Sequence, residues 1–179
     1  MLIRTAKLED LPGIFAIYDA EVLSGTATFE TTPKTPGQRE EWFQAHAPDR
    51  YPLMVADDDG DILGWAGISQ WSPRQAYDRS AESSVYVHPR HQHKGLGRGL
   101  MIELMHRAKA CNRAVLVARI AGDNPASVKL HELLGFETIG VMRRIGEKFG
   151  KVLDVRVMMR HLDEAGPPMP PRKALPPPV

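Results

Sequence analysis

A short segment rich in glycine and basic residues follows a β-prone run near the middle of the chain. The run at residues 85–87 is Val-Tyr-Val, and residues 92–98 read Gln-His-Lys-Gly-Leu-Gly-Arg before apolar residues recur at helical spacing. Glycine lets a backbone approach an anion closely, and a helix N-terminus presents unpaired N–H groups with a partial positive charge. A strand, a glycine turn and a helix in this order suit the binding of a pyrophosphate.

Other interpretations of the turn are weaker or remain open on spacing alone. A dinucleotide-binding fold needs G-x-G-x-x-G and a later acidic partner, whereas the glycines here are Gly95, Gly97 and Gly99. A Walker loop needs G-x-x-x-x-G-K followed by Ser or Thr, which the segment lacks. A purely structural glycine turn stays possible until a second motif is considered.

The elements around the turn alternate in type along the chain. Apolar periodicity, caps and turn residues predict helices at 11–24, 35–47, 97–111 and 124–134, and strands at 2–4, 53–56, 62–71, 82–88, 114–120, 136–142 and 152–159. This order predicts a single α/β domain at 1–164, with a mixed sheet flanked by helices. Residues 165–179 hold seven of the 15 prolines and are therefore expected to form an extended or disordered tail.

Two motifs together resemble those of the GNAT superfamily of N-acetyltransferases. Gln92-x-x-Gly95-x-Gly97 after the Val-Tyr-Val strand resembles that family's Q/R-x-x-G-x-G/A acetyl-CoA loop. About thirty residues later, Asn124, His131 and the pair Gly135-Phe136 resemble its second signature. The resemblance implies a mostly antiparallel GNAT sheet and acetyl-CoA as co-substrate. The residues that it implies for acetyl-CoA binding are Val85, Tyr86, Val87, Gln92, His93, Lys94, Gly95, Leu96, Gly97, Arg98 and Asn124.

The resemblance extends to one branch of the family. The run at residues 76–87 is similar to that of phosphinothricin and methionine-sulfoximine acetyltransferases, and Trp71, the Thr28-Phe29 pair and the proline-rich tail also fit that branch. It implies direct transfer of an acetyl group to the amine of a small amino-acid-like substrate, in a homodimer. Another amine, such as a protein N-terminus, a polyamine or an aminoglycoside, is the alternative acceptor. A non-catalytic acyl-CoA-binding protein is the alternative from a different class.

Two residues are candidates for proton transfer. An amine arrives as ammonium, and Glu82 at the start of the cofactor strand could remove its proton directly or through a water. A solvated strand-end carboxylate is the structural alternative for Glu82. His131 occupies the position where many GNAT enzymes have a tyrosine, and it could act as general acid for the thiolate or as a second member of the base relay. A packed helix histidine is the alternative there, and Asn124 could cap the helix as well as bind pantetheine.

Acceptor binding is assigned to three residues in addition to Glu82. Arg74 and Tyr77 are candidates for the substrate's carboxylate, because a guanidinium binds carboxylate in bidentate geometry. Phe29 could wall the acceptor pocket, although solvated or core positions are equally ordinary for Arg74 and Phe29. A backbone N–H of the strand at 85–87 is the expected donor to the thioester carbonyl.

Composition restricts the other possible functions. A net charge of +1 does not argue for a strongly basic surface that binds nucleic acid, and the one cysteine, Cys111, excludes an intrachain disulfide. We expect no metal site, because His88, His91 and His93 fit a solvated basic loop better than a ligand set. Charges near the N-terminus and the absence of a long apolar run predict a cytoplasmic protein without a membrane span.

Overall fold

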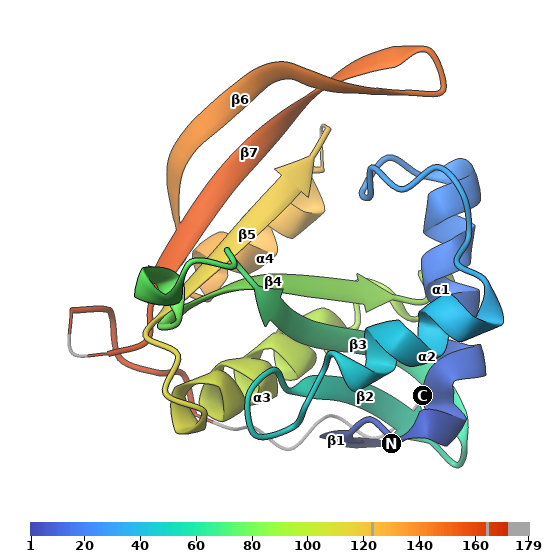
Figure 1. Ribbon diagram of the computed structural model, residues 1–179, viewed down its shortest axis with the longest axis horizontal. Helices are drawn as coiled ribbons and strands as arrows, with labels where there is room; N and C mark the ends of the chain where they lie inside the picture. Colours follow the sequence, from blue (N-terminus) through green and yellow to red (C-terminus); the bar gives the residue numbers. More distant parts are fainter. Residues whose placement is uncertain (123, 164, 172–179) are drawn as a thin grey trace.

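The computed structural model describes residues 1–122, 124–163 and 165–171, and its elements follow the predicted order (Figure 1). The strands are β1 (Leu2–Thr5), β2 (Leu53–Asp58), β3 (Asp61–Gln70), β4 (Ser80–Val87), β5 (Val115–Ala121), β6 (Glu137–Lys148) and β7 (Lys151–His161). The helices are α1 (Leu11–Ser24), α2 (Pro36–Gln44), α3 (Leu96–Ala110) and α4 (Pro125–Leu133), and the 3-10 turns are η1 (Leu8–Asp10), η2 (Gln75–Tyr77) and η3 (Pro89–His91).

Helix starts match their sequence signals better than strand ends do. Thr35 accepts a hydrogen bond from the backbone N–H of Gln38, which completes the expected capping box of α2. The largest difference is the final hairpin, where β6 and β7 run well past the predicted strands at 136–142 and 152–159. Most of β6 is exposed, so no apolar alternation marks its length in the sequence.

The seven strands form one sheet in the order β1-β2-β3-β4-β5-β7-β6. Every neighbouring pair is antiparallel except β4 and β5, which run parallel. These two strands pair only between residues 80–82 and 115–117 and then separate, as the view in Figure 1 shows. The predicted mixed sheet of a GNAT fold is confirmed, and the separation opens a gap in its middle.

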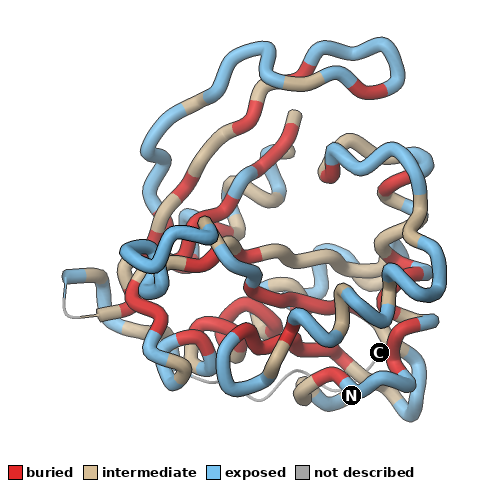
Figure 2. The backbone as a smooth tube through the Cα atoms, viewed as in Figure 1, coloured by how far each residue is buried: buried red, intermediate tan, exposed pale blue. Residues whose placement is uncertain are grey.

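Alternating strand residues build a core on each face of the sheet, and buried segments are concentrated there (Figure 2). Ala66 and Ile68 of β3 pack in the cluster that includes α3, while Trp65 packs in the cluster that includes α1. Tyr86 of β4 packs against this second cluster. The even-numbered residues of β4 therefore face α1 and α2, and the odd-numbered residues face α3.

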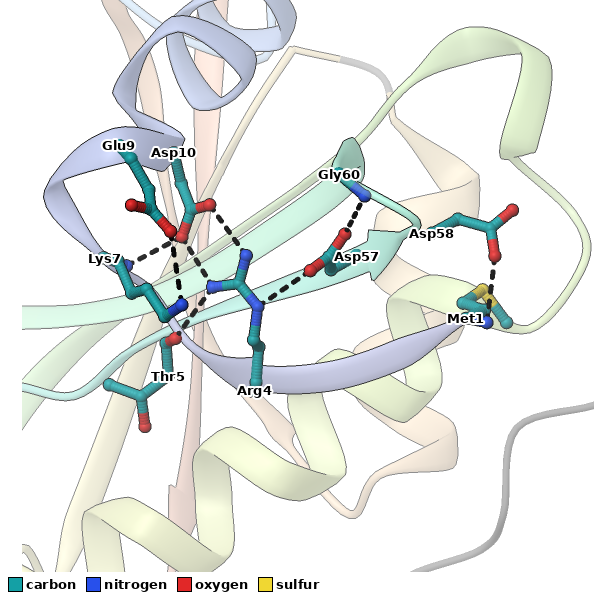
Figure 3. Close-up of polar contacts among 9 residues, drawn as sticks. All are labelled: Met1, Arg4, Thr5, Lys7, Glu9, Asp10, Asp57, Asp58 and Gly60. Carbon is teal, nitrogen blue, oxygen red and sulfur yellow. Dashed lines mark hydrogen bonds and ion pairs between the residues drawn. The ribbon is translucent and has the colours of Figure 1, made fainter.

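A polar network fixes the first strand to the sheet (Figure 3). Arg4 donates to both carboxylate oxygens of Asp10 at 2.7 and 2.8 Å and to Asp57 at 2.9 Å, and the backbone N–H of Lys7 donates to Asp10 at 2.7 Å. Burial raises the pKa of Asp10, but the Arg4 and Lys7 hydrogen bonds outweigh it and leave the pKa below its ordinary value. Asp10 is thus a buried anion fully compensated by its partners.

The described part of the predicted tail packs against the domain. Arg160, a buried side chain of β7, donates to the carbonyl oxygens of Pro167 and Pro168 at 3.0 and 3.1 Å. The carbonyl oxygen of Pro170 lies 3.0 Å from Nε2 of His106 in α3. Residues 165–171 therefore lie on β7 and α3, and residues 172–179 of the predicted tail are outside the described residues.

Candidate functional site

A cleft of about 760 Å³ occupies the gap between the separated parts of β4 and β5. Its walls are residues 83–87 of β4 and 118–121 of β5, its end is the turn before α3, and α4 closes one side. All the residues predicted to bind acetyl-CoA line this cleft except Lys94. Distant segments of the sequence are therefore brought together as the two motifs predict.

The free edge of β4 presents backbone hydrogen-bonding groups to the cleft. The N–H of His88 donates to Leu63 in β3, and the register places Tyr86 opposite Trp65 and Val85 opposite Ala66. In an antiparallel ladder hydrogen-bonded and non-hydrogen-bonded pairs alternate, so Tyr86 directs its backbone to β3 and Val85 directs its own toward β5. Val85 can therefore pair with an extended ligand arm or donate to a carbonyl.

The turn before α3 has the local geometry of an anion site. His93 and Gly95 both have positive φ, at 60° and 82°, which turns neighbouring N–H groups toward one side. The first N–H groups of α3 have no partner within the helix. Gln92 donates from its side chain to the carbonyl oxygen of Val87 at 3.1 Å and so holds the turn against the end of β4. These amides and the nearby Arg98 fit a diphosphate, while the exposed Lys94 does not line the cleft.

Helix α4 contributes one buried titratable group to the cleft. His131 is 3% exposed, and its Nδ1 donates to the carbonyl oxygen of Ser127 at 2.8 Å. Burial lowers its pKa, so the ring is neutral near pH 7 and Nε2 carries the lone pair. An imidazole in this state accepts a proton, which favours the base-relay role over the general-acid role. Asn124 caps α4 by accepting from Ser127 N–H at 3.0 Å, and it lines the cleft as well.

Glu82 lies at the point where β4 and β5 separate, and it forms an ion pair that the sequence analysis did not foresee. Arg119 of β5 donates to its two carboxylate oxygens at 2.6 and 2.7 Å. The Arg119 side chain is 51% exposed and Glu82 is 18% exposed. Hydrogen bonding to Glu82 raises the pKa of Arg119. A charged residue inside the apolar run Ala-Val-Leu-Val-Ala-Arg-Ile-Ala was the available signal.

Of the three other predicted acceptor residues, Arg74 and Tyr77 lie in one short turn and Phe29 lies elsewhere. The ring of Phe29 lies against Gly146 of β6, so closely that an added Cβ there would collide with it. Buried Lys148 donates to the carbonyl oxygen of Thr28 at 2.9 Å and so ties the α1–α2 connection to the β6–β7 hairpin. Arg74 and Tyr77 are exposed in the segment before β4, and the Arg74 guanidinium bonds to no described residue. Within one chain, therefore, Arg74 and Phe29 do not contact each other and do not form a single acceptor site among the described residues.

The described part of the chain has neither a metal cluster nor a helix that could cross a membrane. No group of three or more His, Cys, Asp and Glu side chains there is arranged to hold a metal ion. None of the helices there has the length and apolar character needed to cross a membrane.

Comparison with known proteins gives consistent matches. Residues 13–136 match the acetyltransferase (GNAT) family. The chain is 43% identical to an L-methionine sulfoximine/L-methionine sulfone acetyltransferase of Pseudomonas paraeruginosa, over 90% of this chain and 94% of the relative. It is 37% identical to phosphinothricin N-acetyltransferase of Streptomyces viridochromogenes, over 95% of this chain and 92% of the relative.

A solved structure supports the same relationship. The GNAT superfamily phosphinothricin acetyltransferase of Sinorhizobium meliloti, in complex with acetyl-CoA, is similar with a TM-score of 0.87. The two chains are 38% identical, and the match covers 91% of this chain and 89% of the other.

Proposed function

Since the chain belongs to the acetyltransferase (GNAT) family, we propose that it moves an acetyl group from acetyl-CoA to the amino group of a small amino-acid-like substrate. It is an acetyl-CoA-dependent N-acetyltransferase, like its relatives. Methionine sulfoximine, phosphinothricin and related amino acids are the proposed acceptors. The names of relatives that match over at least 90% of this chain support this choice.

The observation that carries the proposal is the continuous cleft from the separated strands to the turn before α3. Acetyl-CoA supplies a thioester whose carbonyl carbon is open to attack by an amine. In our proposal the amides of residues 92–98 hold its diphosphate, and the free edge of β4 at Val85 pairs with the pantetheine arm. An N–H on this edge would also stabilise the oxyanion that forms at the carbonyl.

Glu82 and His131 are the proposed proton acceptors. Glu82 lies on the α1 and α2 face of β4, in register with Ser69 of β3, and would receive the ammonium proton directly or through a water. Neutral His131, with its Nε2 lone pair, is the second proposed proton acceptor. Arg119 must share or release Glu82 when an ammonium approaches, because both cations bind the same carboxylate.

Direct transfer fits the side chains better than a covalent acyl-enzyme does. Burial raises the pKa of Cys111, and its Sγ donates to the carbonyl oxygen of Pro48 at 3.5 Å. A thiol in this state is a poor nucleophile at neutral pH. The amine itself is therefore the proposed attacking group.

A thiol-release assay with acetyl-CoA tests the acceptor class. We expect turnover with methionine sulfoximine, methionine sulfone or phosphinothricin that exceeds turnover with spermidine, an aminoglycoside or an N-terminal peptide by at least roughly tenfold in kcat/KM. Preference for one of the last three would overturn the amino-acid assignment, and tight acetyl-CoA binding with no turnover of any amine would favour a binding protein.

We further propose a homodimer. The β6–β7 hairpin exposes Ile139, Met142, Ile145, Phe149 and Val152, and apolar patches of this kind mark interaction surfaces. Light scattering coupled to size-exclusion chromatography tests the stoichiometry, and Ile145→Asp should give a monomer. Because the reaction consumes acetyl-CoA, we also propose a cytoplasmic location.

A further inference from the structure

A second hollow lies on the other face of β3 and β4, beneath α1 and α2. Its volume is about 90 Å³, well above the roughly 10–15 Å³ that a single water molecule needs. Five aromatic side chains line it, namely Phe15, Tyr18, Trp42, Trp65 and Tyr86. None of the described residues that line it is Asp, Glu, Lys or Arg.

Two residues that line this hollow have an unused hydrogen-bonding position: the buried indole N–H of Trp65, which has no partner among the described residues, and the ring of His46. His46 is 8% exposed, and its Nδ1 lies 2.7 Å from the carbonyl oxygen of Trp42, so Nδ1 carries the proton. Nε2 then holds a lone pair that accepts from no described residue. The ring lies over Gly67, where an added Cβ would be 3.5 Å from Nε2 and 2.8 Å from Leu53. The approach to Nε2 is an ordinary contact, whereas the approach to Leu53 would be a collision, so Gly67 is required by the packing of Leu53.

The hollow adjoins the acetyl-CoA cleft at two shared residues. Ser84 and Tyr86 line both spaces, and Ser69, which lines the hollow, is in register with Glu82. Glu82 and Ser84 lie on one face of β4, so their Cα atoms are about 7 Å apart. In methionine sulfoximine with its amine at Glu82, the four bonds from the amine to the sulfur, at roughly 1.5 Å each, cover at most about 6 Å of this distance, and the S-methyl group extends the reach further.

We propose that this hollow, lined by the five aromatic rings and His46, binds the methyl sulfoximine end of the acceptor's side chain. This inference rests on the proposed function, and it specifies which chemical group of the acceptor the enzyme recognises. The S-methyl group packs on the aromatic rings, and the sulfoximine N–H donates to Nε2 of His46. The hydroxyls of Ser69 and Ser84 are the donors for the sulfoximine oxygen.

The polarity of the hollow makes the selection specific. Methionine sulfone has the same shape, but an oxygen replaces the N–H and meets the lone pair of Nε2. The phosphinate of phosphinothricin is an anion, and burying an uncompensated charge among aromatic rings is costly. A substrate that leaves a buried hydrogen-bonding group without its partner also loses binding free energy. The order of kcat/KM is therefore sulfoximine, then sulfone, then phosphinothricin.

The test compares methionine sulfoximine with methionine sulfone in the wild type, His46→Phe and His46→Gln. We expect the wild type to favour the sulfoximine about tenfold or more in kcat/KM. His46→Phe should reduce the ratio to about one, and His46→Gln should keep part of it because its amide oxygen accepts. Acetyl-CoA affinity and melting temperature verify that each variant is folded.

A kcat/KM ratio that is unchanged in His46→Phe overturns the proposal. The proposal is also overturned if the wild type acetylates other amino acids but neither methionine sulfoximine nor methionine sulfone. If no amino acid is acetylated, the proposed function fails. The inference about the hollow is then tested separately, by measuring whether methionine sulfoximine binds there. The ¹⁵N shift of His46 Nε2 should then still move when methionine sulfoximine is added to the full chain with CoA. An unmoved signal would reject the hollow as a binding site.

Discussion

Arg119 holds both carboxylate oxygens of Glu82 at 2.6 and 2.7 Å, where β4 and β5 cease to pair. A guanidinium in this position restricts the orientation of the carboxylate, and it also competes with an incoming ammonium. We therefore propose that Arg119 is a positioning residue that acts through Glu82, and we expect the two side chains to behave as one unit in kinetics.

Glu82→Gln should lower kcat/KM by roughly 10²–10⁴-fold if the carboxylate is the base. Higher pH should restore part of this activity, since more of the amine is then neutral. Arg119→Gln should lower kcat/KM about tenfold, and the double variant should match Glu82→Gln alone. Additive losses in this double-mutant cycle would show that Arg119 acts independently, for example on acetyl-CoA, whose affinity is measured in parallel.

Two substitutions of Gly97 distinguish an effect on acetyl-CoA binding from an effect on folding. An added Cβ would lie 3.4 Å from Leu130 and 3.5 Å from Val87, so Gly97→Ala should fold normally. Gly97→Asp places a carboxylate in the first turn of α3, which is favourable for the helix but repels a diphosphate. We expect acetyl-CoA affinity to fall at least roughly tenfold in Gly97→Asp with the melting temperature unchanged or higher. Equal affinities by calorimetry would place the diphosphate elsewhere.

His131 should remain catalytically competent below its ordinary pKa of about 6.5. Burial lowers its folded-state pKa, so stability begins to decline below about pH 6.5, where the unfolded chain is protonated first, whereas activity declines only as the pH approaches the lower folded-state pKa. His131→Ala should therefore change the acidic limb of the kcat/KM profile. A change confined to the alkaline limb would restore the general-acid role.

The tail residues nearest the domain should support stability. Truncation after residue 164 removes the carbonyl acceptors of Arg160, whose buried guanidinium would lose them at a cost of about 1–3 kcal/mol. Truncation after Pro171 keeps these contacts and is the matched control. We expect a lower melting temperature only in the shorter chain, with kcat largely intact in both. A loss of kcat in the folded shorter chain would give the tail a catalytic part.

The Arg4–Asp10 pair should make stability depend on pH. The folded-state pKa of Asp10 is below its ordinary value, so its contribution is present above about pH 4 and is lost as the pH falls further. Asp10→Asn should lower the free energy of unfolding by about 1–3 kcal/mol at pH 7 and by less at pH 3. Glu9→Gln, in an exposed ion pair, is the control and should leave the urea midpoint unchanged.

The sequence by itself determined the order of the elements, the cofactor turn and the class of reaction. These features depend on local chemistry, since Gly95, Thr35 and Asn124 carry their turn and cap signals in neighbouring residues. Such signals are read within a few positions of the chain.

Only the tertiary structure decided what lies across the sheet. The Arg119–Glu82 pair joins residues 37 positions apart, and the lone pair of His46 faces a hollow built from two helices and two strands. A histidine's tautomer depends on which carbonyl its other nitrogen meets, and a charge's partner depends on strand register. Neither is encoded locally, so the same residue types could have been solvated in another fold.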